Sequence, residues 1–177
     1  MDAQDKHAKF EDLIMPHLDA AYNLAHWLIR NTSDAEDVVQ EAFLRAFRFL
    51  DGFQGGNSRA WLLSIVRNVS YDWLRANRNK KEIIQFDEEL HSPEQIVSGS
   101  ELTLMRTSQQ QVIRQAIEEL PVGIREVTIL RELEGVPYRE IAEIVQVPVG
   151  TVMSRLARAR NQLQRCLPAR LRKAESL

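Results

Sequence analysis

The stretch GVPYREIAEIVQVPVGTVMSRLARARNQLQR, residues 135–165, decides the fold of its half of the chain. Residues 138–145 carry apolar side chains at helical spacing, and Pro137 suits the first turn of a helix. A tight turn at residues 146–147 separates this short helix from a longer one, expected from about Pro148 to Leu167. Two helices joined by a tight turn predict a helix-turn-helix.

The longer helix has an apolar face and a polar face when successive residues are placed ~100° apart. Ser, Thr, Gln and Arg side chains read base edges and hold phosphates when a helix lies in a DNA major groove. The residues after Arg155, as far as Lys173, include arginines but no Asp or Glu. A solvated face in an all-helical protein is the alternative interpretation. The pattern favours duplex DNA binding by these residues: Thr151, Ser154, Arg155, Arg158 and Gln162.

Composition limits the possible classes of protein. The chain has 177 residues, 44% hydrophobic and 27% charged, which predicts a soluble protein of one ordinary domain or two small ones. The N-terminus resembles no signal peptide and no apolar run is long enough to span a membrane, so we expect a cytoplasmic protein. The single cysteine excludes internal disulfides and a cysteine-based zinc site. A net charge of -2 means that any DNA binding depends on local basic patches.

The rest of the chain predicts an all-α fold, because apolar residues recur at helical spacing and no strand pattern is present. Pro16 is expected to bend the first turns of the first helix or to delay its start. A capping box from Ser33 to Glu36 is expected to begin the second helix. The predicted helices are Phe10–Arg30, Ser33–Leu50, Arg59–Asn79, a segment from about 101 to 120, and Ile124–Glu134. They form two small helical domains, residues 1–81 and 101–177, joined by an acidic flexible linker at residues 82–100.

The polar side of the second predicted helix has two interpretations. Charges of both signs alternate along it, and Glu41 and Arg45 form an i,i+4 pair that stabilises a helix by ~0.3–0.5 kcal/mol. A self-stabilising solvated helix explains this pattern. A docking surface for another protein is the second interpretation, because hydrogen-bond acceptors crowd the first two turns: Asp34, Glu36, Asp37, Gln40 and Glu41.

The outward side of the third predicted helix suits single-stranded nucleic acid. Arginines there alternate with an amide and an aromatic ring, so cations can follow phosphates while a ring stacks on a base: Arg67, Asn68, Tyr71, Arg75 and Arg78. The glycine-rich loop at residues 53–58 leaves room for an extruded base. A basic helix end that complements the helix dipole is equally compatible with these residues.

An enzyme is a third class to weigh. Glu88 and His91 have the Glu-x-x-His spacing of di-metal helix bundles, which would make a carboxylate-metal helical enzyme. The motif has no second copy and lies in the expected linker beside a proline. No glycine-rich phosphate loop or nucleophile motif is present. We therefore expect no catalytic residue, no metal site and no cofactor.

Several segments together resemble a known family. They are DAEDVVQEAFLRAFRFLDGF (34–53), AWLLSIVRN (60–68), the pair Leu120–Pro121, and EIAEIVQVPVGTVMSRLARAR (140–160). In this order and spacing, from about residue 10 to 167, the chain resembles the extracytoplasmic-function sigma factors of bacterial RNA polymerase. The last segment also resembles the output domain of two-component response regulators. A stand-alone helix-turn-helix transcriptional regulator is therefore the alternative.

The resemblance implies a role for each domain. Sigma region 2 at residues 1–81 would dock on the clamp of the largest subunit of core RNA polymerase and would melt and read the -10 promoter element as single strand. Sigma region 4 at residues 101–177 would read the -35 element and touch the flap of the second-largest subunit. The implied polymerase-binding residues are Asp34, Glu36, Asp37, Gln40, Glu41, Phe43 and Arg45. The implied -10 residues are Phe53, Asn57, Ser58, Arg59, Trp61, Arg67, Asn68, Tyr71, Arg75 and Arg78. The implied -35 residues are Gly150, Thr151, Ser154, Arg155, Arg158 and Gln162.

The resemblance also bears on partners and location. It implies no catalysis and no small-molecule substrate, with an anti-sigma factor as a further partner. The protein would be cytoplasmic without inserting into the membrane, and an anti-sigma factor would be able to hold it at the inner membrane face. Two departures from the family pattern concern DNA contacts. The loop reads Phe53-Gln54-Gly55-Gly56 where the family often has a charged sequence, and Met153 stands where Lys or Arg is common.

Overall fold

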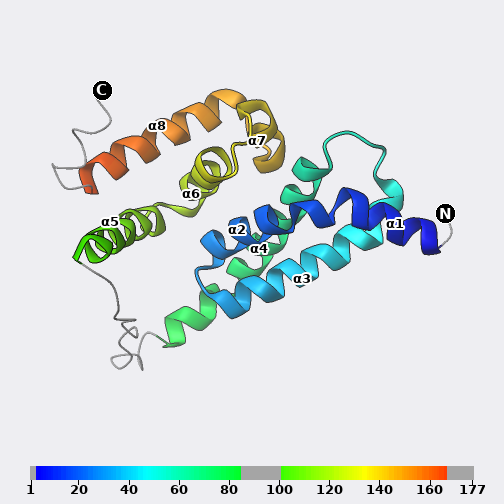
Figure 1. The fold of residues 1–177 in the computed structure, drawn as a ribbon, viewed down its shortest axis with the longest axis horizontal. Helices are drawn as coiled ribbons and strands as arrows, with labels where there is room; N and C mark the ends of the chain where they lie inside the picture. The colour runs from blue at the N-terminus through cyan, green and yellow to red at the C-terminus, as the bar shows by residue number, and fades with distance from the viewer. Residues whose placement is uncertain (1–2, 85–100, 167–177) are drawn as a thin grey trace.

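A computed structural model describes residues 3–84 and 101–166 (Figure 1). The expected linker at residues 82–100 lies outside the described residues except for its first three, and so does the Glu88–His91 pair. Every described element is helical, which confirms the predicted all-α class. In chain order the elements are α1 (Ala3–Leu13), η1 (Met15–His17), α2 (Leu18–Ile29), α3 (Thr32–Phe49), η2 (Leu50–Gly52), α4 (Ser58–Ile84), α5 (Glu101–Glu118), α6 (Val122–Thr128), η3 (Ile129–Leu133), α7 (Tyr138–Val145) and α8 (Val149–Cys166).

The first predicted helix, Phe10–Arg30, is wrong as a single element, but the expected delay of a helix start by Pro16 is confirmed for α2. α1 ends at Leu13, a 3-10 turn with Pro16 follows, and α2 begins at Leu18. Proline has no backbone N–H and its ring clashes with the carbonyl of the preceding turn, so an uninterrupted α-helix through this position is unfavourable. Beyond the break, α1 contacts the C-terminal half of α3 through Phe10, whose ring meets Phe43 and Phe47.

Asparagines cap the N-termini of α3 and α4. The predicted capping box at Ser33 is wrong, because α3 already begins at Thr32 and the Asn31 side chain accepts a hydrogen bond from the backbone N–H of Asp34 at 3.0 Å. Asn57 accepts one from the N–H of Ala60 at 3.0 Å before α4. Asparagine caps a helix as well as serine does. Asn31 is the cap because its backbone is extended, as an N-cap requires, whereas Ser33 already lies within the helix.

The helix expected at residues 124–134 is also more complex. It begins at Val122, after Pro121, and widens into the π-helix η3 from Ile129. The N–H of Glu134 bonds to the carbonyl of Ile129 at 3.1 Å, and Gly135 then adopts a φ of 63°, which ends the helix.

The helix-turn-helix is present as predicted. α7 and α8 are joined through Gln146, which adopts a left-handed φ of 55°. α8 buries Val152, Leu156 and Ala159 on one side and ends at the exposed Cys166.

The N-terminal helices α1–α4 and the C-terminal helices α5–α8 pack on each other (Figure 1). α6 lies against α2, and α7 lies against α4. Buried side chains of both groups join one apolar cluster, for example Leu24 and Leu62 with Val127 and Ile141. The two predicted helical units therefore share a core.

No helix among residues 3–84 and 101–166 has the length and apolar content needed to cross a lipid bilayer.

Candidate nucleic-acid interface

The acidic side of α3 is open to solvent over its first turns. Glu36, Asp37, Gln40 and Glu41 are exposed, and Asp34 is half-buried at the capped N-terminus. Their carboxylates and amide form one continuous acceptor surface, because residues three and four apart on a helix are neighbours.

The remaining two residues predicted for polymerase binding lie differently. Phe43 is half-buried and packs against Phe10 of α1, with ring centroids 6.0 Å apart, at the edge of the core. Arg45 is held by Glu41 at 2.7 Å and by Asp72 of α4 at 3.2 Å. The sequence analysis missed Leu44, which is 63% exposed beside the acidic surface. The break in apolar periodicity at Leu44 was the available signal.

The glycine-rich loop borders a pocket of about 450 Å³, called here the loop pocket. Phe53 and Trp61, whose ring centroids are 5.0 Å apart, form its aromatic wall beside Asn57. Glu143 and Ile144 of α7 also line the pocket. Aromatic rings can stack on a base, but residues of α7 also line this pocket.

Ser58 and Arg59 begin α4 next to the loop. The Ser58 hydroxyl lies 3.2 Å from Nε2 of His17, and burial together with the nearby Arg59 lowers the pKa of His17 below its ordinary value. Arg59 donates from Nη2 to the backbone carbonyl of Glu134 at 2.7 Å and to its carboxylate at 3.0 Å. The amide of Asn23 donates to the same carboxylate at 3.0 Å. The Arg59 guanidinium is thus bound to Glu134, a residue of the C-terminal half of the chain.

Arg67 is occupied in the same way. It donates from Nε to the carboxylate of Glu126 at 2.7 Å and from Nη2 at 3.3 Å, and the Glu126 side chain is only 1% exposed. Burial raises the pKa of Glu126, although the hydrogen bonds from Arg67 oppose that rise. The guanidinium also lies 4.5 Å from the ring centroid of Tyr71, and burial with the Glu126 charge raises the pKa of that phenol to about 12.

The other residues predicted for the single strand remain at the surface. Asn68 and Arg78 are exposed, and Arg75 forms an ion pair with Asp72. Asn68, Tyr71, Arg75 and Arg78 follow one another along α4 from the Arg67–Glu126 contact.

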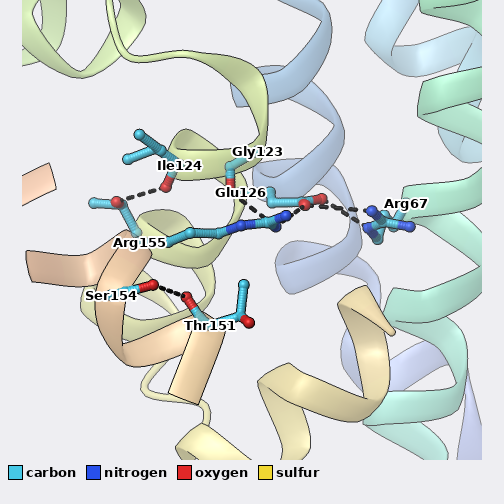
Figure 2. Close-up of polar contacts among 8 residues, drawn as sticks. Arg67, Gly123, Ile124, Glu126, Thr151, Ser154 and Arg155 are labelled. Atoms are coloured by element: carbon cyan, nitrogen blue, oxygen red, sulfur yellow. Dashed lines mark hydrogen bonds and ion pairs between the residues drawn. The ribbon is translucent and has the colours of Figure 1, made fainter. Parts of the chain in front are cut away.

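The polar face of α8 divides into an outward and an inward part. Gly150, Ser154 and Arg158 are exposed, with the Ser154 hydroxyl donating to the carbonyl of Thr151 at 3.0 Å. Arg155 instead points toward α6, with Nη1 3.4 Å from both the Glu126 carboxylate and the Gly123 carbonyl. Figure 2 shows Glu126 between Arg155 of α8 and Arg67 of α4. Thr151 and Gln162 are half-buried.

Within the described part of the chain, no three His, Cys, Asp or Glu residues are grouped so that they could hold a metal ion.

Known proteins match both halves of the chain. The family models for Sigma-70 region 2 and for Sigma-70, region 4 match residues 13–80 and 110–163. The RNA polymerase sigma-H factor of Pseudomonas aeruginosa is 34% identical over 178 residues, covering 96% of this chain and 91% of that protein. The ECF RNA polymerase sigma-E factor of Escherichia coli K12 is 36% identical over 146 residues, covering 75% and 73%.

Solved structures give the same result. The sigma factor RpoE in complex with the anti-sigma factor NepR, from Bartonella quintana, aligns with a TM-score of 0.66 and 28% identity over 89% of this chain and 95% of that one. CnrH in complex with the cytosolic domain of CnrY aligns with a TM-score of 0.62 and 27% identity over 94% and 89%.

The chain therefore belongs to the sigma-70 family of RNA polymerase sigma factors, in its extracytoplasmic-function group. It is an alternative sigma factor that directs transcription initiation, as the resemblance predicted. The stand-alone regulator is not favoured, because the region 2 match lies over helices that such a regulator would lack. From here the helices α1–α4 are called region 2 and the helices α5–α8 region 4.

Proposed function

We propose that the acidic surface of α3 docks this sigma factor on core RNA polymerase, with Leu44 as its apolar contact. The observation that carries this proposal is the exposure of four acceptor side chains and of Leu44 on one helix. A large apolar side chain exposed beside charged ones is typical of a binding surface. Phe43 and Arg45 would act through the packing and orientation of α3.

In the same proposal region 2 and region 4 bind promoter DNA in two forms. The loop pocket and the exposed side of α4 would bind the -10 element as single strand, with Phe53 and Trp61 stacking on bases and Arg59 and Arg67 meeting phosphates. The outward face of α8, with Ser154 and Arg158, would read the -35 element in the duplex major groove. The sigma factor makes and breaks no bond itself and places the active site of the polymerase at the start point.

Partners and location follow from this role. Core polymerase, promoter DNA and an anti-sigma factor are the proposed partners. The RpoE and CnrH structures were solved with an anti-sigma factor and with CnrY, respectively, which supports the last of these. The protein would work in the cytoplasm, where the polymerase and the chromosome are.

Run-off transcription tests the proposal. Bacterial core polymerase is incubated, with and without the chain, on a library of templates with randomised -10 and -35 elements, and the initiated transcripts are sequenced. We expect initiation on a defined promoter subset only when the chain is present. If the chain alone binds duplex DNA tightly but core gains no promoter-specific initiation, the stand-alone regulator is the correct class.

Variants of α3 test the docking surface itself. Asp37→Arg and Leu44→Glu should each reduce core binding and run-off product about tenfold or more, because each places an unfavourable charge in the contact. Asp12→Arg, an equivalent charge reversal at an exposed site on α1, is the matched control and should leave both unchanged.

A further inference from the structure

A pocket lies where α2, α4 and α6 meet, and it shares no lining residue with the loop pocket. It has a volume of about 290 Å³ and is called here the junction pocket. Among the described residues, those that line it include no Asp or Glu but four arginines: Arg30, Arg75, Arg78 and Arg125. Cations gathered around a small cavity without anions create a positive potential inside it, which attracts an anionic ligand.

Arg125 is the most buried of the four arginines, with 7% of its surface exposed. It donates hydrogen bonds to the backbone carbonyl of Leu120 at 2.8 Å and to that of Trp27 at 3.1 Å, while its buried Nε has no hydrogen-bond partner among the described residues. Burial, together with the nearby charge of Arg30, lowers the pKa of Arg125 below its ordinary value. An anion in the pocket would compensate this buried positive charge.

Arg30 is an unusual residue for its backbone position. It ends α2 in the left-handed conformation, with a φ of 65°, where glycine is favoured because it has no Cβ. Its guanidinium lies 3.8 Å from Glu118, and the same carboxylate is bound more closely by Arg114, at 3.1 Å. The local structure therefore does not explain an arginine at this position, whereas an anion in the junction pocket would.

Arg75 and Arg78 complete the cluster from α4. Arg75 pairs with Asp72, whose carboxylate also binds Arg45 at 3.2 Å. Arg78 is exposed, and no ion pair is recorded for it within residues 3–84 and 101–166. The four arginines of the pocket thus outnumber the carboxylates that pair with them, Asp72 and Glu118. A matching ligand carries more than one negative charge, as a diphosphate does.

The rest of the lining indicates that the ligand also has an aromatic part. Tyr71 and Trp73, both half-buried, line the junction pocket together with apolar side chains such as Leu28 and Val122. Aromatic side chains bind planar bases by stacking, and arginines bind phosphates. A volume of about 290 Å³ lies at the small end of the range for ligand pockets, which suits a mononucleotide.

We propose that the junction pocket binds a nucleoside diphosphate, with its phosphates on the four arginines and its base against the aromatic lining. A DNA strand is the other source of phosphate, because Arg75 and Arg78 are among the residues proposed for the -10 element. The free nucleotide is favoured because Arg30 and Arg125 lie on α2 and α6, away from the exposed side of α4, and Arg125 is buried. The proposal does not depend on the promoter-binding role of α4.

Isothermal titration calorimetry of the full chain tests the ligand class. The probes are ADP, GDP, inorganic pyrophosphate and adenosine. We expect a nucleoside diphosphate to bind at a single site about tenfold or more tightly than pyrophosphate, which lacks the base, and adenosine to bind weakly, because it lacks the phosphates. The nucleotide should also raise the thermal unfolding midpoint, since only the folded chain has the pocket. Equal affinities for pyrophosphate and nucleotide, or no binding of either nucleotide, overturn the proposal.

Two arginine variants test the site. Arg30→Gly removes one cation and places glycine at a left-handed position, so the affinity for the nucleotide should fall about tenfold while the thermal midpoint is retained or raised. Arg125→Gln removes the buried charge but keeps an N–H donor for one of the two carbonyls, and it should lower the affinity by about as much.

Arg139→Gln is the matched control, because it removes a positive charge at an exposed position of α7 outside the pocket. Its affinity should stay within about twofold of the wild type. An equal loss in the control would mean general attraction of anions to the protein and would overturn the site. Arg30→Gly decides the matter if Arg125→Gln does not fold, as circular dichroism would show. A folded Arg30→Gly with wild-type affinity contradicts the proposal.

A DNA arm distinguishes the two sources of phosphate. Binding of a fluorescein-labelled, mixed-sequence single-stranded oligonucleotide is followed by anisotropy, and Arg30→Gly should leave this affinity within about twofold of the wild type. A loss of DNA affinity in a chain that binds no nucleotide would assign the junction pocket to the DNA strand and overturn the proposal. A chain that directs promoter-specific run-off transcription but binds no nucleotide keeps its sigma factor role and loses only this site.

Discussion

Arg155 and Arg158 lie one turn apart on α8 but in different environments. Arg158 is exposed, and the structure records no ion pair for it within the described residues, whereas Arg155 lies against the buried Glu126. The sequence predicted the same DNA role for both, because a helical projection shows a shared face and does not show what a neighbouring helix brings to part of it. The two arginines should therefore respond differently to truncation.

Arg158→Ala should weaken discrimination among -35 sequences by ~1–3 kcal/mol without changing the stability of the free protein. Arg155→Ala should lower the free energy of unfolding by about 1–3 kcal/mol, because a buried carboxylate loses one of its two cations. Promoter competition with the assembled holoenzyme and urea unfolding of the free chain measure the two effects. An unchanged promoter profile together with an unchanged salt slope for Arg158→Ala would remove this residue from the reading face.

Element positions were the most predictable part of the fold. The apolar spacing located α3, α7 and α8 to within one or two residues, since each buries one stripe against the shared core. α4 was predicted to end at Asn79 but continues to Ile84, so the first residues of the predicted linker are helical. The ends and irregularities of the helices were harder to predict, because they depend on which backbone hydrogen bonds form locally. Pro16 divided one helix into two. The π-turn of η3 added a residue that the apolar periodicity does not reveal.

The cap of α3 gives a prediction at this scale. Asn31→Ala should lower the free energy of unfolding by about 1 kcal/mol, because the N–H of Asp34 loses its acceptor. Ser33→Ala, one of the positions where the sequence placed a capping box, should change it by no more than ~0.5 kcal/mol, since alanine is the better helix former. Urea unfolding followed by circular dichroism compares the two. Equal losses would mean that Ser33 shares the capping.

Contacts between the two regions were the least predictable part of the site. Arg67 and Glu126 are separated by 59 positions, and Arg59 and Glu134 by 75. Each of these residues looks like part of a solvated charged face when its own helix is considered alone. The sequence therefore predicted which residues can bind DNA. It did not predict that Glu126 and Glu134 bind Arg67 and Arg59, because these contacts depend on how the two regions pack.

At the scale of the whole molecule, the shared core predicts that both regions unfold together. The three tryptophans, Trp27, Trp61 and Trp73, are all in region 2, whereas circular dichroism records the helices of both regions. Urea unfolding curves from tryptophan fluorescence and from circular dichroism should coincide, because loss of region 4 exposes the apolar surface of region 2. A circular dichroism transition that precedes the fluorescence transition would show that region 4 unfolds separately.

The exposed Cys166 at the end of α8 is the only thiol in this chain, and it lies on the opposite region from the tryptophans. A fluorescent acceptor attached there would receive energy from donors on region 2 alone, without any engineered residue. The efficiency of this energy transfer depends on the distance between the two regions. It would therefore report, in real time, how far region 4 moves when polymerase, DNA or an inhibitor is added.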